Sequence, residues 1–347
     1  MAGDTYIPEQ EMPGMGPHDI GGIGPYERID TTDHGMNHWE VHANALRMAV
    51  TRYTNLGTLD EMRRAAEEFG ERFYQIGYFE RQTEALAIVL KERGMFNDRQ
   101  IQYRMQEIEL RFSAVPKISL PEPPESHGHE HDHGEDQPHE YWKEDEKGEG
   151  PDRHHLMNLA IQELLQERGV LKADEVRYMI EKFDGDFPNR GPQVIARAWT
   201  DPNFKSRLLN DAGPAISELG IDLEYQARII ALENTRDIHN VVVCTLCSCY
   251  PRFLMGQPPT WYKSRSYRSR TIFEPRAVLR EFGTELPADT TIRVHDSNAD
   301  MRYIVVPIRP EGTEGWSEER LSEIITRDNL VGVSLPNPEF DLISNSG

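Results

Sequence analysis

The sequence predicts an α+β protein, in which a helical N-terminal region is joined by a disordered linker to a layered α/β domain. Apolar residues recur at helical spacing before residue 113, whereas no apolar period survives between residues 117 and 152. Strand-like stretches are recognised from residue 240 onward, the first of them just before three clustered cysteines. We therefore expect three regions, with boundaries at 1–116, 117–152 and 153–347.

The first region opens with a Gly/Pro-rich stretch from Pro13 to Pro25 and then becomes helical. Thr58 to Glu61 form a capping box, with a hydroxyl at the cap and a carboxylate three residues later. The helix that follows is expected to end at Gly70, because glycine is typical of the position after a helix. Further helices are expected over Phe79–Arg93 and Asp98–Phe112.

The second region is acidic and rich in proline and histidine, a composition typical of a disordered, self-repelling linker. Its histidines could store metal, or they could be a solvated spacer with weak metal affinity, because nothing in the pattern fixes a ligand geometry. These histidines are His127, His129, His131, His133 and His139.

The third region resumes the helical pattern and then turns to strands. Helices are expected from Leu156 to Gly169 and over Asp174–Phe183, and helix and loop over 188–219. Strands are expected at Asn240–Val243, Thr290–Val294 and Arg302–Pro307.

The charge balance excludes several classes of partner. Lysine and arginine total 38 against 59 acidic residues, a net charge of -21 in 347 residues, which argues against nucleic acid and against an anionic membrane surface. No apolar run reaches the roughly 18 residues of a membrane helix, and no signal peptide is visible. We expect a cytoplasmic protein, in which clustered cysteines are not a disulfide framework.

The three cysteines of the chain, Cys244, Cys247 and Cys249, have C-x-x-C-x-C spacing, and thiolates are soft ligands that favour transition metals. A dithiol redox pair, three structural cysteines, or a zinc site completed by His239 or His295 are alternatives. The remaining interpretation is a three-sulfur site that also uses backbone nitrogens around Ser248. One coordination position would stay open for water or substrate.

The residues around the cysteines resemble the α subunit of nitrile hydratase. The signature Val242–Pro251 carries the resemblance, which covers residues 153–336. Matching segments are Gln193–Trp199, Pro258–Lys263, Glu274–Arg276, Arg309–Gly315 and Thr326–Asp328.

This resemblance implies a low-spin metal bound by three cysteine sulfurs and by the backbone nitrogens of Ser248 and Cys249. It also implies that Cys247 is oxidised to sulfinic acid and Cys249 to sulfenic acid. Thr245 resembles the cobalt type, since the iron type has serine there. Cobalt(III) is therefore the expected cofactor, with iron(III) as the alternative.

The N-terminal region is similar to the first half of the β subunit of the same family. The motifs are His18–Gly22 and Trp39–Glu40. The resemblance places Arg63 where the family has an arginine that hydrogen-bonds the oxidised cysteines, and Tyr78 beside the substrate. A solvated helix-face arginine and a core tyrosine are the alternatives.

Two departures from the family pattern matter. The β-like part stops near Phe112, without the small barrel that normally follows, so we expect a second polypeptide that carries the barrel and a hetero-oligomer. Arg252 stands where nitrile hydratases have tryptophan, which resembles thiocyanate hydrolase, and a cation there would favour an anionic substrate. Otherwise Arg252 is a surface residue or forms an ordinary salt bridge.

The resemblance implies hydration of a nitrile, in which the Cys249 sulfenate is nucleophile or base and Arg63 fixes its oxygen. Trp261 and Tyr78 would line the substrate pocket, and Gln193 would lie behind the metal ligands and tune their orientation and basicity. Hydrolysis of thiocyanate is the alternative reaction, and a non-catalytic metal-binding assembly protein is the non-enzymatic alternative.

Overall fold

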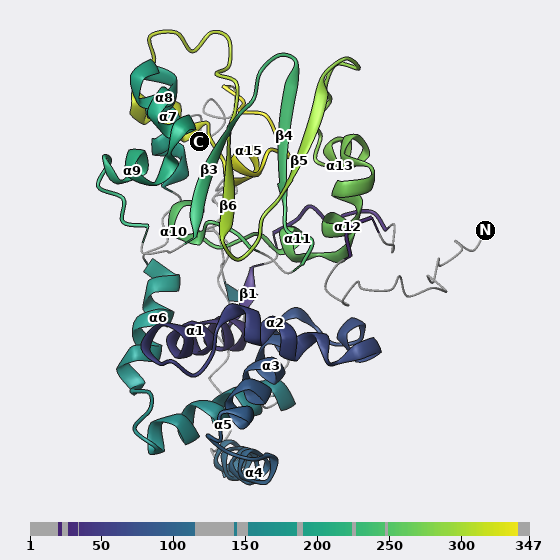
Figure 1. Ribbon diagram of the computed structural model, residues 1–347, viewed down its shortest axis with the longest axis vertical. Helices are drawn as coiled ribbons and strands as arrows, with labels where there is room; N and C mark the ends of the chain where they lie inside the picture. Colours follow the sequence, from purple (N-terminus) through teal and green to yellow (C-terminus); the bar gives the residue numbers. More distant parts are fainter. Residues whose placement is uncertain are drawn as a thin grey trace, which may run out of the picture. The chain divides into compact units, whose positions relative to one another are not determined.

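The computed structural model of the protein describes residues 20–22, 27–33, 35–114, 142–143, 152–185, 190–223, 227–246 and 249–338 (Figure 1). The chain divides into two compact units. The helical unit spans His34–Ile180, and the α/β unit combines Met1–Asp33 with Glu181–Ser346. Each unit therefore contains residues from both sides of the 117–152 segment.

The helical unit is built mainly from six helices in its described residues. Its elements are β1 (Met36–Asn37), α1 (His38–Tyr53), α2 (Leu59–Glu67), the 3-10 helix η1 (Gly70–Tyr74), α3 (Tyr78–Glu92), α4 (Asp98–Ala114), β2 (Trp142–Lys143), α5 (Arg153–Glu167) and α6 (Ala173–Gly185). Its first four helices lie in the N-terminal region that the sequence predicts to be helical, whereas α5 and most of α6 come from the region expected to belong to the α/β domain.

The capping box before α2 is confirmed. The Glu61 amide donates to the Thr58 hydroxyl at 3.2 Å, and the Thr58 amide donates to the Glu61 carboxylate at 2.8 Å. The helix ends at Glu67 and not at Gly70, which has a φ of 55° and begins η1 instead. A left-handed glycine cannot extend an α-helix, so the stop signal lies slightly beyond the actual end.

Helix α5 follows the linker in sequence and packs against α1, α3 and α4. His42 on α1 is buried and bonds the Gln162 carboxamide at 2.5 Å and the Asn158 carboxamide at 3.0 Å. On the opposite side, Arg104 pairs with Glu163 at 3.1 Å and with Glu167 at 2.6 Å. The helix is therefore bound to the N-terminal helices by both buried and exposed polar contacts.

A second contact of α5 is made through the carboxylate of Glu84 on α3. It accepts from His154 at 2.8 Å and from both terminal nitrogens of Arg72, at 2.6 and 2.5 Å. Burial alone would raise the pKa of Glu84, but these hydrogen bonds outweigh it and lower the pKa from 4.5 to about 2. Glu84 is therefore ionised at neutral pH.

Most of the predicted linker lies outside the described residues, including its five named histidines. Three of its residues are described: Asp152 caps α5, and Trp142 and Lys143 form β2 and pair in parallel with Met36 and Asn37 of β1. The prediction of a disordered linker is therefore wrong at Trp142 and Lys143. Their partner strand lies more than 100 positions earlier, so no local sequence pattern indicates the pairing.

The α/β unit holds the mixed elements that the sequence predicts for the C-terminal region. No helix in the described part of the chain combines the length and apolar character that crossing a membrane requires. The elements of the α/β unit are α7 (Gly191–Thr200), α8 (Pro202–Asn210), α9 (Ala212–Ser217), β3 (Arg228–Glu233), β4 (Ile238–Val243), α10 (Arg252–Met255), α11 (Thr260–Lys263), α12 (Arg265–Phe273), α13 (Pro275–Glu281), β5 (Thr291–Asp296), β6 (Met301–Val306), α14 (Glu318–Glu323) and α15 (Arg327–Val331).

The strands form two parallel pairs, β3 with β6 and β4 with β5. In Figure 1 the pairs stand next to each other, with α8 and α9 against β3 and α13 against β5. The three predicted strands are confirmed as β4, β5 and β6, each within two residues at the start and the end. Strand β3 was not predicted.

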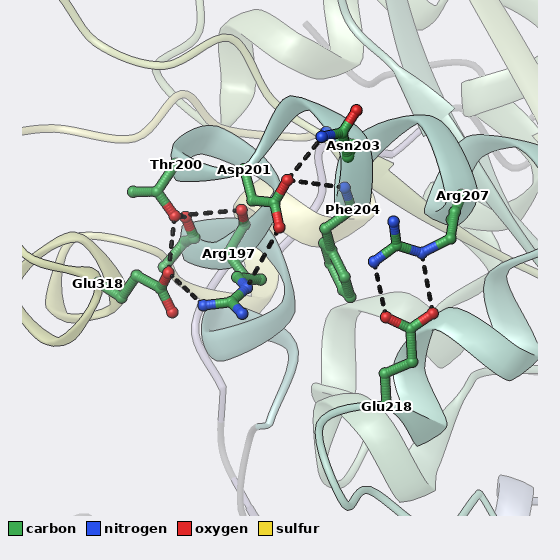
Figure 2. Close-up of polar contacts among 9 residues, drawn as sticks. Arg197, Thr200, Asp201, Asn203, Phe204, Arg207, Glu218 and Glu318 are labelled. Carbon is green, nitrogen blue, oxygen red and sulfur yellow. Dashed lines mark hydrogen bonds and ion pairs between the residues drawn. The ribbon is translucent and has the colours of Figure 1, made fainter.

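The turn between α7 and α8 is stabilised by a polar network (Figure 2). Asp201 caps α8 by accepting from the amides of Asn203 and Phe204 at 2.9 and 3.0 Å. Arg197 and the Thr200 hydroxyl both donate to Glu318, at 2.9 and 2.8 Å, and so join α7 to α14. The helical layer is thus fixed at a sharp turn by capping and by one shared carboxylate.

Gly332 ends α15 with a φ of 87° and lies directly against β4. A Cβ at this position would clash with the carbonyl oxygen of Asn240. The Gly332 carbonyl in turn accepts a 2.7 Å hydrogen bond from the buried ring of His239. Only glycine satisfies both the left-handed backbone and the close approach to the strand.

Candidate metal centre

The cysteine loop begins where β4 ends. Val241 to Val243 are buried and pair with Val294 to Asp296 of β5, so Cys244 and Ser297 emerge at the same edge of the strand pair. The Ser297 amide donates to the Val243 carbonyl at 2.7 Å and continues the pairing by one residue. The pairing of the buried end of β4 with the more exposed β5 therefore fixes the start of the loop.

Cys244 is fully buried and Cys249 is 5% exposed, and neither forms a disulfide. Cys247 and Ser248, the predicted ligands between them, lie outside the described residues. Two unbridged, buried thiols at the two ends of one short loop are a donor set that suits a soft transition metal. No set of three His, Cys, Asp or Glu ligands occurs among the residues that the structure describes.

Thr245 is held by the carboxylate of Asp296, the last residue of β5. One carboxylate oxygen accepts from the Thr245 amide at 3.0 Å, and the other accepts from its hydroxyl at 2.5 Å. Hydrogen bonds to an ionised acceptor are short and strong. Both the backbone and the side-chain torsion of Thr245 are therefore fixed.

Arg268 on α12 holds the loop from another direction. Arg268 is 2% exposed, and its guanidinium donates to the Cys244 carbonyl at 3.0 Å and to the Thr245 carbonyl at 2.6 Å. The planar fork of arginine suits two adjacent acceptors. These bonds satisfy two buried carbonyls and fix the backbone at the start of the cysteine loop.

Two tyrosines complete the framework around the loop. Tyr262 donates to the Cys249 carbonyl at 2.9 Å, and Tyr267 donates to the Val242 carbonyl at 2.6 Å. Burial raises the pKa of Tyr262 well above its usual value, and the negative charge of a Cys244 thiolate beside it would raise the pKa further. The hydroxyl therefore stays protonated and remains a donor.

Trp261, predicted at the substrate, is 2% exposed. Its ring makes edge contacts with Tyr267 and Phe282, both at 4.8 Å between centroids. In the described part of the chain it belongs to an aromatic core behind the loop. Its contact with a substrate stays a prediction.

Two buried polar groups near the loop have no hydrogen-bond partner among the described residues. They are the Tyr250 hydroxyl, directly after Cys249, and the carboxamide of Gln257. A buried donor or acceptor without a partner costs about 1–3 kcal/mol, so such groups are commonly satisfied by water or a bound molecule. Neither residue was predicted as functional, because an apolar context hides an unsatisfied group from sequence analysis.

The remaining predicted residues of the α/β unit lie on helices. Arg252 is partly buried and begins α10, where its amide donates to the Tyr250 carbonyl at 2.9 Å. Gln193 is exposed in the first turn of α7. The roles predicted for both residues stay predictions.

Arg63 and Tyr78 belong to the helical unit. Arg63 lies on α2 and pairs with Asp60 at 3.2 Å, with its side chain 15% exposed. Tyr78 begins α3 and contacts Phe79 edge-on at 5.0 Å, beside the buried Trp39. Because the cysteines belong to the other unit, the functional roles of these two residues stay predictions.

The two histidines considered as zinc ligands are used elsewhere. His239 bonds the Gly332 carbonyl with one ring nitrogen and the Asn234 carboxamide with the other. His295 bonds the Asn240 carboxamide at 2.8 Å. Burial lowers the pKa of both rings, as expected for neutral structural histidines.

Two family descriptions match successive parts of the chain. The nitrile hydratase alpha chain matches residues 152–334, and the N-terminal part of the nitrile hydratase beta subunit matches residues 15–134.

Individual relatives agree with these matches. A nitrile hydratase subunit alpha from Rhodococcus sp is 49% identical over 176 residues, which are 50% of this chain and 88% of the relative. A cobalt-containing nitrile hydratase subunit alpha from Pseudonocardia thermophila is 46% identical over 50% of this chain and 86% of its own. The thiocyanate hydrolase subunit gamma of Thiobacillus thioparus is 40% identical over 53% and 80%.

Solved structures give the same result. An Fe-type nitrile hydratase from Comamonas testosteroni Ni1 superimposes with a TM-score of 0.51 at 40% identity, over 54% of this chain and 92% of that one. A recombinant thiocyanate hydrolase with cobalt centres superimposes with a TM-score of 0.52 at 39% identity, over the same shares. With its buried cysteine loop in the matched region, the chain belongs to the nitrile hydratase family.

Proposed function

We propose that the protein is a metal-dependent hydratase that adds water to the carbon–nitrogen triple bond of a nitrile and releases the amide. The observation that carries the proposal is the pair of buried, unbridged thiols, Cys244 and Cys249, whose carbonyls are held by hydrogen bonds, in a chain of this family. Cobalt-containing relatives support cobalt as the metal.

The residues present fit a thiolate metal site. Cys244, Cys247 and Cys249 would hold cobalt(III), together with the amide nitrogens of Ser248 and Cys249. The bound metal would supply Lewis acidity toward the nitrile or water.

The chain itself would do the remaining work. The carbonyls of Cys244, Thr245 and Cys249 are occupied by Arg268 and Tyr262, which fixes the peptide planes of the loop. An oxidised Cys249 would place an oxygen at a position that is only 5% exposed to water, and Arg63 would hydrogen-bond that oxygen. The unsatisfied Tyr250 hydroxyl remains available to donate to a small polar molecule.

The active assembly would include a second polypeptide. The beta-subunit match ends at residue 134, and the barrel half of that subunit is not part of the matched segment. Relatives are named as subunits, which supports a hetero-oligomer. If the purified chain alone, loaded with cobalt, hydrated nitriles as fast as its complex with a barrel polypeptide, the need for this partner would be refuted.

Hydrolysis of thiocyanate is a second candidate, and Arg252 favours it. A cation at the first turn of α10, three residues after Cys249, would attract an anionic substrate. The balanced reaction converts thiocyanate and two waters into carbonyl sulfide, ammonia and hydroxide. Nitrile hydration consumes one water and releases no ammonia.

One comparison of substrates separates these reactions. The full chain, co-expressed with a barrel polypeptide and supplied with cobalt, is assayed with aliphatic and aromatic nitriles and with thiocyanate. Amide formation without ammonia supports the hydratase, whereas carbonyl sulfide with ammonia supports the alternative. Arg252→Trp should raise KM for thiocyanate and leave KM for an uncharged nitrile nearly unchanged.

Metal and mass analysis test the site itself. We expect one cobalt per chain and a gain of two oxygens on Cys247 and one on Cys249. Cys249→Ala should abolish turnover, and full activity of a metal-loaded Cys249→Ala protein would contradict the assignment. Zinc with unoxidised thiols would instead indicate a non-catalytic metal-binding protein.

A further inference from the structure

An N-terminal strap, defined here as the described residues 20–22 and 27–33, lies against the same helix that holds the cysteine loop. The Gly22 amide donates to the Ser269 carbonyl at 3.1 Å, and Arg270 donates to the Glu27 carbonyl at 2.6 Å. Ser269 and Arg270 directly follow Arg268, whose guanidinium binds the loop. One turn of α12 therefore contacts both segments.

The rest of the strap is fixed at several points. The Ile29 amide donates to Glu281 at 2.8 Å, and Glu281 is itself paired with Arg270 at 2.6 Å. Arg327 donates to Asp33 at 2.8 Å. Ile29 is 4% exposed, so the strap also buries apolar surface.

Gly21 brings the strap into contact with the cysteine loop. A Cβ built on Gly21 would lie 3.1 Å from Cγ2 of Thr245 and 3.5 Å from Cγ1 of Ile272. The backbone of Gly21 does not have a positive φ, unlike that of Gly22 at 73°. The conformation of the chain therefore does not require glycine at 21, but a Cβ there would approach Thr245 more closely than an ordinary van der Waals contact.

Thr245 cannot turn away from this contact at low cost. Its hydroxyl is held by Asp296 at 2.5 Å, and the direction of Cγ2 follows from that of the hydroxyl, because both are fixed to one tetrahedral carbon. A Cβ at position 21 would push Thr245 by a few tenths of an ångström, against the hydrogen bond that its hydroxyl makes to Asp296. The Thr245 carbonyl is bound by Arg268, and the preceding residue is Cys244.

We propose that Gly21 is a positioning residue for the cysteine loop, and that the docked strap holds Thr245 in the geometry that metal binding requires. The proposal rests on the proposed function in one respect, that the loop binds the metal. It also predicts that an N-terminal segment contributes to a site more than 200 positions later in the sequence, although none of its residues is a ligand.

The test is a double-mutant cycle in the full-length, metal-free chain, read by titration with Co2+ and its thiolate-to-cobalt absorption. Gly21→Ala is expected to weaken apparent Co2+ affinity about tenfold, which corresponds to an overpacking cost of about 1.4 kcal/mol. Thr245→Ser removes Cγ2 and keeps the hydroxyl. The double variant Gly21→Ala/Thr245→Ser should bind Co2+ within about twofold of Thr245→Ser alone.

The matched control is Gly22→Ala, which strains a left-handed residue of the same strap but places its Cβ in open space. Its effect should add to that of Thr245→Ser without rescue. The proposal is overturned if Gly21→Ala binds Co2+ like the unmodified chain, or if Thr245→Ser rescues neither variant or both equally.

Thermal unfolding of the same variants separates this proposal from the proposed function. If the unmodified chain takes up no Co2+, the metal site is wrong. The contact is then judged by unfolding midpoints alone, where Thr245→Ser should restore the midpoint lost in Gly21→Ala and not the one lost in Gly22→Ala. Additive midpoints in both cycles would overturn the role of Gly21.

Discussion

The carboxylate of Asp296 binds Thr245 twice, once through the backbone amide and once through the side-chain hydroxyl. The two residues are 51 positions apart and come from the ends of neighbouring parallel strands. Because Thr245 lies between Cys244 and Cys247 in sequence, this contact links the end of β5 to the conformation of the cysteine loop.

Asp296→Ala should therefore destabilise the protein and reduce its cobalt content, since it leaves a buried amide and hydroxyl without an acceptor. We expect a loss of about 1–3 kcal/mol in the free energy of unfolding, measured by urea denaturation. Asp296→Asn keeps one carbonyl oxygen as an acceptor, so its free energy of unfolding should lie between those of Asp296→Ala and the unmodified chain. A stability and cobalt content equal to those of the unmodified chain would contradict this account.

Arg268→Lys should lower the free energy of unfolding nearly as much as Asp296→Ala, although the charge is retained. A single ammonium group cannot reproduce the forked donation to the carbonyls of Cys244 and Thr245, so the expected cost is about 2 kcal/mol. Arg280→Lys, on an exposed position of α13, is the control and should change stability by less than about 0.5 kcal/mol. Equal unfolding curves for the two variants would show that the fork is unimportant.

Glu84→Gln tests the contact between α3 and α5 through its pH dependence. The folded pKa of Glu84, about 2, lies below its ordinary value of 4.5, so its ionised form stabilises the protein above pH 4.5. This contribution is lost as the pH falls from about 4.5 to about 2. Glu84→Gln should be less stable at pH 7 and should show a flatter stability profile across that window.

Removing any carboxylate also reduces the net negative charge, so Glu84→Gln needs a charge-matched control. Glu109→Gln, at an exposed position of α4, serves this purpose. If both variants show the same profile of unfolding midpoint against pH, the loss of stability at low pH does not come from the contact of Glu84 with His154 and Arg72.

Gly332→Ala should destabilise the α/β unit strongly, because the new methyl group meets the carbonyl of Asn240 and the backbone is left-handed. We expect at least about 2 kcal/mol, from backbone strain and overpacking together. Gly312→Ala has a similar φ of 82° but places its methyl group in open space. The difference between the unfolding midpoints of Gly332→Ala and Gly312→Ala therefore measures the clash with the Asn240 carbonyl. Equal midpoints would show that this clash does not destabilise the protein.

The sequence predicts local features well. Thr58 and Glu61 form the expected cap, and α3, α4 and α5 occur where apolar periodicity places them, because helices depend on contacts within a few residues. Helix α1 was not placed, since its buried residues include His42 and Asn44, which obscure the apolar stripe. The α-subunit and β-subunit resemblances are confirmed by the family matches.

The framework of the candidate site was not predicted. Arg268 lies in the run Arg265–Arg270, whose composition suggests a solvated helix. It is nevertheless buried, and two carbonyls accept hydrogen bonds from its guanidinium. Asp296 ends an ordinary strand, and no local pattern links it to Thr245. Strand β3 pairs with β6 over a long sequence separation, which periodicity does not record.

The exchange of segments between the two units bears on how the chain can be divided. A break between Ala114 and Trp142 would produce two fragments, but the first supplies the strap of the α/β unit and the second supplies α5 of the helical unit. The fragments would therefore stay associated after cleavage, and their separation would require release of the strap from the α/β unit and of α5 from the helical unit. If such pieces were synthesised independently, each would need a segment of the other to complete its compact unit.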